Sequence, residues 1–168
     1  IQELRIGIGI NSGTALAGNL GSEQRFDYSI LGDSVNLASR LEGQSKTYGV
    51  EILMSEATRA PVQDLAFLEL DLVQVVGKSE PVRIFTLVGD ASFARSEVFL
   101  ETESTQKRML EHYRASRWQE ALELIEQLEQ LDLQRFTGYL SMMRKRIEAF
   151  RNSPPGKDWD GVERRLVK

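Results

Sequence analysis

The spacing of hydrophobic and polar positions divides the first part of the chain into strands. Residues 4–10 alternate large aliphatic side chains with glycines on the opposite phase. This pattern predicts a strand with one smooth face, which another backbone or a ligand can approach closely. The residues Asn-Ser-Gly at 11–13 predict a turn. Residues 14–20 and 25–30 predict two further strands, joined by the polar segment 21–24.

The spacing changes to that of a helix after Gly32. Asp33 is predicted to be the N-cap, because its carboxylate can accept hydrogen bonds from the free backbone N–H groups of the first turn. One face of this helix has the spacing of a core-facing stripe. It is formed by Ser34, Leu37, Ala38, Leu41, Ser45 and Tyr48. On the opposite, polar side, Asn36 and Arg40 are four residues apart, so both can reach the same object.

The pattern that follows predicts shorter strands and helices. A short strand is expected at 50–54, and a short helix over 55–62 with Ser55 as its cap. Residues 67–75 and 82–88 have the alternation of two closing strands. Strands and helices mixed in this way indicate an α+β fold.

The second half of the chain predicts a linker, three helices and a tail. Residues 90–103 are small, polar and aperiodic, which is typical of a linker. Apolar residues recur at helical spacing within 104–152 and predict three amphipathic helices. The last helix is expected to stop at Asn-Ser-Pro-Pro-Gly, residues 152–156. In the tail, residues 153–168, Trp159 is predicted to be a docking anchor.

Composition excludes several classes of protein. The chain has 168 residues, of which 41% are hydrophobic and 27% charged, as in ordinary globular domains. It has no apolar run near the ~20 residues that span a bilayer. A net charge of −4 argues against a general nucleic-acid surface. The absence of cysteine excludes a disulfide framework and suits a reducing compartment, so a cytoplasmic location is expected.

The order of residues 28–42 adds a functional hypothesis. Tyr-Ser-Ile-Leu-Gly-Asp-Ser-Val-Asn-Leu-Ala-Ser-Arg-Leu-Glu resembles the signature of class III nucleotidyl cyclases, the adenylyl and guanylyl cyclases. By this resemblance, residues 1–89 are the C-terminal half of a ferredoxin-like catalytic domain of the bacterial adenylyl cyclase type. The pattern from Tyr113 to Leu122 resembles one tetratricopeptide-type repeat. Because one repeat cannot bury its own face, residues 104–152 should pack on the cyclase domain or on a protein partner.

The resemblance assigns roles residue by residue. Arg40 matches the family's transition-state arginine, and Asn36 matches the asparagine that holds the ribose. A guanidinium suits this role because it presents several donors to phosphate oxygens and stays charged. Ser29 matches the position that reads the purine edge, and serine there favours ATP over GTP.

One position departs from the family pattern. A lysine that contacts the triphosphate often stands where this chain has Val76, and Lys78 is the candidate to bind the substrate instead. The family's two Mg²⁺ or Mn²⁺ ions are held by aspartates upstream of this region, so no metal ligand is assigned here. The chain begins at Ile1 rather than Met and is expected to be a fragment that is inactive alone.

The resemblance also implies partners and leaves alternatives open. Class III cyclases act as dimers with composite sites, and residues 19–25 match an arm that reaches the second subunit. We therefore expect a homodimeric adenylyl cyclase that makes cyclic AMP from ATP, with any membrane anchor in a missing N-terminal region. The alternatives are a guanylyl cyclase, or a non-catalytic scaffold whose helices recruit a partner. Val76 is the feature that favours the scaffold.

Overall fold

The computed structural model describes residues 6–22, 25–74, 80–131, 133–156 and 158–164. The central sheet has four strands in the order β1–β4–β6–β5. They are β1 (Ile8–Ile10), β4 (Ile52–Ser55), β5 (Ala66–Val73) and β6 (Val82–Gly89). Strands β2 (Leu16–Ser22) and β3 (Arg25–Leu31) form a separate antiparallel hairpin.

The helices complete the α+β architecture that the sequence predicts. In chain order they are α1 (Asp33–Tyr48), α2 (Glu56–Arg59), α3 (Glu97–Arg114), α4 (Trp118–Gln130) and α5 (Thr137–Asn152). Two short 3₁₀ helices, η1 (Phe93–Arg95) and η2 (Gln134–Phe136), precede α3 and α5. The last helix ends at Asn152, where the Ser-Pro-Pro-Gly sequence begins, as predicted.

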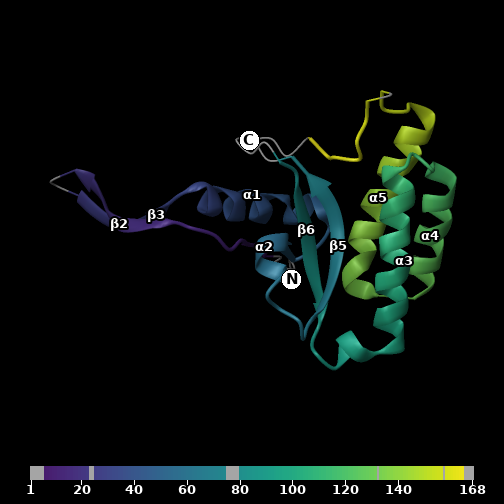
Figure 1. The fold of residues 1–168 in the computed structure, drawn as a ribbon, viewed down its shortest axis with the longest axis horizontal. Helices are drawn as coiled ribbons and strands as arrows, with labels where there is room; N and C mark the ends of the chain where they lie inside the picture. The colour runs from purple at the N-terminus through teal and green to yellow at the C-terminus, as the bar shows by residue number, and fades with distance from the viewer. Residues whose placement is uncertain (1–5, 23–24, 75–79, 132, 157, 165–168) are drawn as a thin grey trace, which may run out of the picture.

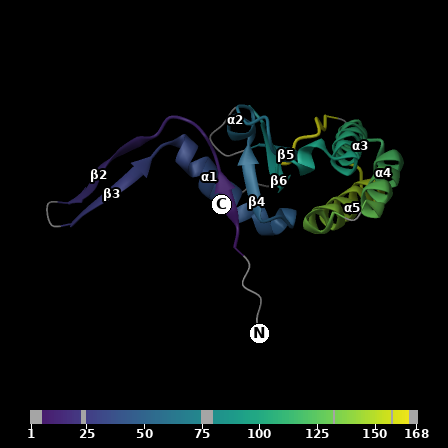
Figure 2. The ribbon, with the colours of Figure 1, turned by 90° about the horizontal axis from the view of Figure 1, so that it is seen from below.

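The elements are arranged as layers with a projecting arm. Figure 1 shows α1 on one side of the sheet and the helices α3, α4 and α5 on the other, with α4 outermost. The β2–β3 hairpin extends away from this body, and the perpendicular view in Figure 2 shows the same projection. Strand β1 is parallel to β4, whereas β6 is antiparallel to both β4 and β5.

The smooth face predicted for the first strand is where α1 packs. A Cβ atom built on Gly9 would lie 2.1 Å from the carbonyl oxygen of Ala38 and 2.3 Å from the backbone N of Glu42. Only a residue without a side chain allows this contact, so the prediction of close backbone approach is confirmed. The strand itself is shorter than predicted, and residues 1–5 lie outside the described part of the chain.

The predicted linker at 90–103 is wrong over most of its length. Helix α3 begins at Glu97, with the Ser96 side chain accepting a hydrogen bond from the Phe99 backbone N–H at 3.2 Å. Within this segment the buried residues of α3 are Phe99 and Thr102. A single apolar residue and a polar one do not form a helical stripe, which depends on apolar residues at the buried positions.

The helical extension and the sheet share one hydrophobic core. Buried residues of α1, β4, β5 and β6 and those of α3, α4 and α5 belong to a single cluster. Strand β5 is an edge of the sheet in strand order, yet most of its side chains are buried, because α3 packs along it. This supports the prediction that the helices pack on the preceding domain; the domain boundaries stay a prediction.

The tail returns from α5 to the free edge of β5. Trp159 lies against Tyr113, Trp118 and Phe150, with ring centroids 5.2–5.6 Å away, which fits the predicted docking anchor. Beyond it, the backbone N–H of Glu163 donates to Leu72 O at 2.8 Å, and the N–H of Gln74 donates to Glu163 O at 2.9 Å. These bonds form a short parallel bridge with Val73.

Two glycines lie where the end of α1 meets the start of α5. A Cβ atom built on Gly138 would lie 2.6 Å from the carbonyl oxygen of Gly49, and one on Gly49 would lie 2.6 Å from the carbonyl carbon of Gly138. Both obstacles are backbone atoms, which cannot move aside as a side chain can. The contact sets how closely α5 approaches α1.

We expect Gly138→Ala to destabilise the chain, although alanine favours a helix over glycine by ~1 kcal/mol. The overpacking cost of about 1–3 kcal/mol should outweigh that gain, because two backbone segments must separate. Urea denaturation followed by circular dichroism measures the change. Gly43→Ala is the matched control: Gly43 is exposed within α1 and a Cβ there meets no atom within 4 Å. It should be neutral or stabilising, and equal stability of the Gly138 variant and the parent would contradict the close-contact argument.

Candidate active site

The β2–β3 hairpin leads directly into the helix that carries the candidate site. Ser29 lies on β3 and pairs with Gly18 on β2. Side chains alternate between the two faces of a strand, so Ser29 points away from the face that carries its exposed neighbours Tyr28 and Ile30. Ser29 is half-buried, and a Cβ on Gly18 would meet no atom within 4 Å. The face around Ser29 is therefore open to a ligand.

Gly32, and not Asp33, is the N-cap of α1. Gly32 has φ 146°, a backbone conformation that favours glycine, and no side chain caps the helix. Its carbonyl oxygen instead accepts the backbone N–H groups of Val35 and Asn36, each at 3.1 Å. The predicted N-cap role of Asp33 is wrong. Asp33 is the first helical residue, where its negative charge interacts favourably with the positive end of the helix dipole.

Asn36 and Arg40 lie one turn apart on α1, on the side away from the buried stripe. Asn36 is exposed and Arg40 is half-buried, whereas Leu37 and Leu41 are buried. Four residues of helix correspond to ~6 Å along the axis, a length that a sugar and its attached phosphate can span. The structure thus brings Asn36 and Arg40 to one face, and it places Ser29 on the strand that enters this helix.

Asn11, in the predicted turn at 11–13, is a positioning residue. Its side-chain amide donates to Ser34 O in the first turn of α1 at 3.0 Å. The same side chain accepts a hydrogen bond from the Ser55 hydroxyl at 2.6 Å. Asn11 therefore joins the end of β1 to the start of α1 and the end of β4. Ser55 is the N-cap residue of α2, as predicted, but its side chain makes no capping hydrogen bond, because its hydroxyl donates to Asn11 instead.

Two other features of the predicted active site are the substrate-binding lysine and the metal ligands. Lys78 and Val76 belong to residues 75–79, which lie outside the described residues. Among the described residues, no group of three or more His, Cys, Asp or Glu side chains could hold a metal ion. The side chains described here therefore do not fit a two-metal site.

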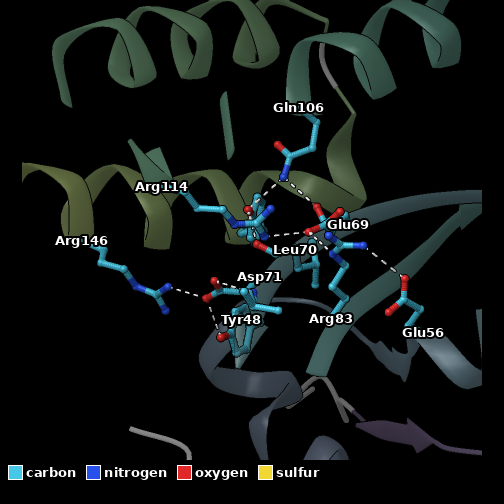
Figure 3. Close-up of polar contacts among 11 residues, drawn as sticks. Tyr48, Glu56, Glu69, Leu70, Asp71, Arg83, Gln106, Arg114 and Arg146 are labelled. Carbon is cyan, nitrogen blue, oxygen red and sulfur yellow. Dashed lines mark hydrogen bonds and ion pairs between the residues drawn. The ribbon is translucent and has the colours of Figure 1, made fainter. Parts of the chain in front are cut away.

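A buried polar network holds the other end of α1, and Figure 3 shows its members converging from α1, β5 and α5. The Tyr48 hydroxyl donates to Asp71 Oδ2 at 2.8 Å, and Arg146 Nη1 donates to the same oxygen at 2.5 Å. Asp71 is fully buried and the Arg146 side chain is 14% exposed. Burial lowers the pKa of Arg146, but the attraction of Asp71 outweighs it, so the pKa lies above its usual value and the guanidinium stays charged.

The network continues into the helical extension. The Tyr139 hydroxyl donates to Leu70 O at 2.7 Å and accepts from the Gln106 side chain at 2.9 Å. Arg114 Nη2 donates to Glu69 Oε1 at 2.6 Å. Figure 3 shows the Gln106 and Arg114 side chains reaching from the helices toward β5. This layer leaves no local pattern in the sequence, because its partners are 33 to 75 residues apart in the chain.

We expect the chain to lose stability above about pH 10. Burial raises the pKa of Tyr48, Tyr113 and Tyr139 above the ordinary 10.0, for Tyr113 to about 12. Below pH 10 these phenols are neutral in both states; above it the unfolded chain loses protons first, which favours unfolding. Urea midpoints at about pH 9 and about pH 11 measure the fall. The variant Tyr48→Phe should lose less stability between these two pH values. An equal loss in the variant and the parent would contradict a contribution of Tyr48 to the pH dependence.

The comparison with protein families decides the class. Residues 1–89 match the family described as the adenylate and guanylate cyclase catalytic domain. The chain belongs to this family. The match ends where β6 ends and does not extend to α3, α4 and α5. The family membership confirms the cyclase resemblance of residues 28–42, whereas the resemblance of the helices to a tetratricopeptide repeat stays a prediction.

Relatives and solved structures in this cyclase family match the same part of the chain. Adenylate cyclase 1 of Rhizobium meliloti is 40% identical over 90 residues, which cover 53% of this chain and 14% of that protein. Adenylate cyclase of Anabaena cylindrica is 37% identical over 89 residues, 51% of this chain and 18% of that protein. The crystal structure of the adenylyl cyclase CyaB from P. aeruginosa has a TM-score of 0.41 at 37% identity, covering 47% and 40% of the two chains. The chain thus spans less than a fifth of the length of the two relatives.

Proposed function

We propose that this chain supplies the base-reading and transition-state residues of an adenylyl cyclase, which converts ATP to 3′,5′-cyclic AMP and pyrophosphate. The observation that carries the proposal is the placement of Asn36 and Arg40 one turn apart on α1, on the side away from its buried stripe. The family membership of residues 1–89 and the adenylate cyclase relatives support it.

The proposed reaction is an intramolecular phosphoryl transfer. The ribose 3′-oxygen attacks the α-phosphorus and forms a bond to it. The bond from that phosphorus to the oxygen it shares with the β-phosphorus breaks, and pyrophosphate leaves with this oxygen. The 3′-hydroxyl proton leaves to solvent. Arg40 would donate hydrogen bonds to the oxygens on the five-coordinate phosphorus and neutralise their negative charge. Asn36 would hydrogen-bond the ribose and hold the 3′-oxygen in line.

Ser29 would read the base. Its hydroxyl can accept a hydrogen bond from the adenine amino group and can also donate one. The open face around Gly18 and Ser29 leaves room for a planar ring at this position. In this proposal Lys78 contacts the triphosphate, and the ligands of two Mg²⁺ or Mn²⁺ ions come from residues other than those described here.

The proposed active form is a dimer with composite sites, which the exposed apolar side chains of the hairpin support. Leu16 is 71% exposed and Tyr28 77%, and Ile30 and Leu31 are more than half exposed. Leu16 pairs with Leu31 on one face, whereas Tyr28 and Ile30 lie on the other. A two-stranded hairpin with apolar side chains on both faces is marginal in water. We propose that a second copy of the domain covers it.

Location follows from the substrate in this proposal. A cyclase that consumes cellular ATP acts in the cytoplasm. Among the described residues, none of the helices is both long and apolar enough to cross a membrane.

The complete catalytic domain and this chain alone should differ in their production of cyclic AMP. A complete catalytic domain, in which this chain follows the first half of a cyclase domain, should produce cyclic AMP from ATP with Mn²⁺ or Mg²⁺. The chain alone should produce none. Parallel assays with ATP and GTP measure both products by chromatography. Cyclic GMP as the main product would contradict the role of Ser29, and activity of the chain alone would contradict the external metal site.

A further inference from the structure

The contacts at the end of α1 link it to the helical extension at two independent places. Gly49, at the C-cap of α1, contacts Gly138 of α5 through the backbone. Tyr48, the last residue of α1, shares the Oδ2 atom of Asp71 with Arg146 of α5. The Arg146 guanidinium also lies 5.7 Å from the centroid of the Tyr48 ring. The family match ends at residue 89, so both contacts join the cyclase region to a region beyond that match.

We propose that Arg146 is a positioning residue for the cyclase reaction: through Asp71 and Tyr48 it fixes the helix that carries Asn36 and Arg40. This inference rests on the proposed function and extends it to a region outside the cyclase domain. Arg146 touches neither substrate nor reacting atoms in this proposal. It acts only through the position of α1.

The length and rigidity of α1 make this mechanism effective. Arg40 and Tyr48 are eight residues apart in one uninterrupted helix, a separation of ~12 Å along the axis. A continuous helix moves as one body, so a shift at its C-terminal end displaces the side chains near its start. Misplacing a reacting group by about 1 Å can lower turnover by about 10²-fold.

The burial of the network makes its geometry specific. Asp71 is fully buried and accepts three hydrogen bonds, from Tyr48, Arg146 and the backbone N–H of Leu72. In such a site the partners have few alternative arrangements, because each unpaired group would be costly. Glu163 of the tail lies 3.7 Å from Arg146 Nε and is itself held by backbone bonds to β5. The guanidinium is therefore held from two sides.

The competing explanation is that the network only stabilises the fold. Removing Arg146 alone does not distinguish the two, because it leaves the buried Asp71 carboxylate without its cationic partner. The double variant Asp71→Asn/Arg146→Met does distinguish them, since neutral groups of similar size at a buried ion pair often restore stability. Such a protein folds but lacks the charged link between α5 and the end of α1.

The experiment measures kcat, KM for ATP and thermal unfolding in the complete catalytic domain. We expect the double variant to unfold near the parent's temperature, with kcat lowered about 10- to 100-fold and KM within about twofold. Tyr48→Phe removes one hydroxyl and should lower kcat about fivefold. Arg146→Lys, which keeps the charge, should retain more activity than the double variant.

Arg144→Met is the matched control on the same helix. Arg144 forms an ion pair with Glu129 of α4 at 2.8 Å, within the helical extension. Its substitution should leave kcat unchanged, because this pair does not contact α1. Parental kcat in both Tyr48→Phe and a folded double variant would overturn the inference. An inactive parent domain would refute the proposed function and the inference together, whereas an active parent with unaffected variants would refute the inference alone.

Discussion

Replacing Arg40 with alanine in the complete catalytic domain should lower turnover by about 10²–10³-fold. In the proposed site its guanidinium neutralises charge that develops on phosphorus only in the transition state, so kcat falls and KM for ATP changes little. Folding should be preserved, because Arg40 lies outside the buried stripe of α1 and is only half-buried. Steady-state formation of cyclic AMP measures the fall, and circular dichroism checks the fold.

Two variants make this result specific. Arg40→Lys keeps a positive charge but loses the planar fork of donors, so most of the loss should remain. Arg108→Ala removes the same residue type from an exposed position of α3 and should leave turnover unchanged. Turnover of Arg40→Ala within about twofold of the parent would remove Arg40 from the transition state.

The second large effect concerns stability. Arg146→Met should destabilise the 168-residue chain by about 3 kcal/mol. The loss leaves Asp71, which is fully buried, without its charged partner. It should lie toward the lower end of the usual ~3–5 kcal/mol for a broken buried pair, because Tyr48 and the Leu72 N–H still donate to the carboxylate. Urea denaturation measures the change in the free energy of unfolding.

The same helix offers the comparison. Arg144→Met removes an ion pair whose Glu129 partner is 43% exposed, and such pairs contribute at most ~1 kcal/mol. The difference between two substitutions only two residues apart isolates the effect of burial. Equal stability losses in the two variants would show that the buried Asp71–Arg146 pair contributes no more to stability than the exposed pair.

The site helix and its strand could be predicted because their signals are local. The stripe of Leu37, Leu41 and Tyr48 faces the core as its spacing indicates. The glycines of the first strand predicted a close backbone contact, which α1 provides at Gly9. Residues 28–42 lie in consecutive elements, so their order alone places Ser29, Asn36 and Arg40 near one another in the chain.

The predictions that were wrong depended on polar residues with partners beyond the local pattern. Ser55 has the type and position of a helix cap, but Asn11, 44 residues away, takes its hydroxyl. The start of α3 was missed because Thr102, a polar residue, occupies a buried position of its first turns, as Gln106 does further along the helix. Gln106 tolerates burial since its side-chain N–H groups donate to Glu69 O and Tyr139 Oη. Pairings of this kind arise only when the chain has folded.

The bridge between the tail and β5 has a consequence for association between chains. An exposed edge strand offers unpaired N–H and C=O groups to any other strand, which is a common start of aggregation. Glu163 occupies the N–H of Gln74 and the carbonyl of Leu72 at the edge formed by β5. The tail thereby blocks part of one side of the sheet. In the described part of the chain, lateral growth of the sheet is then directed toward β1 at the opposite side.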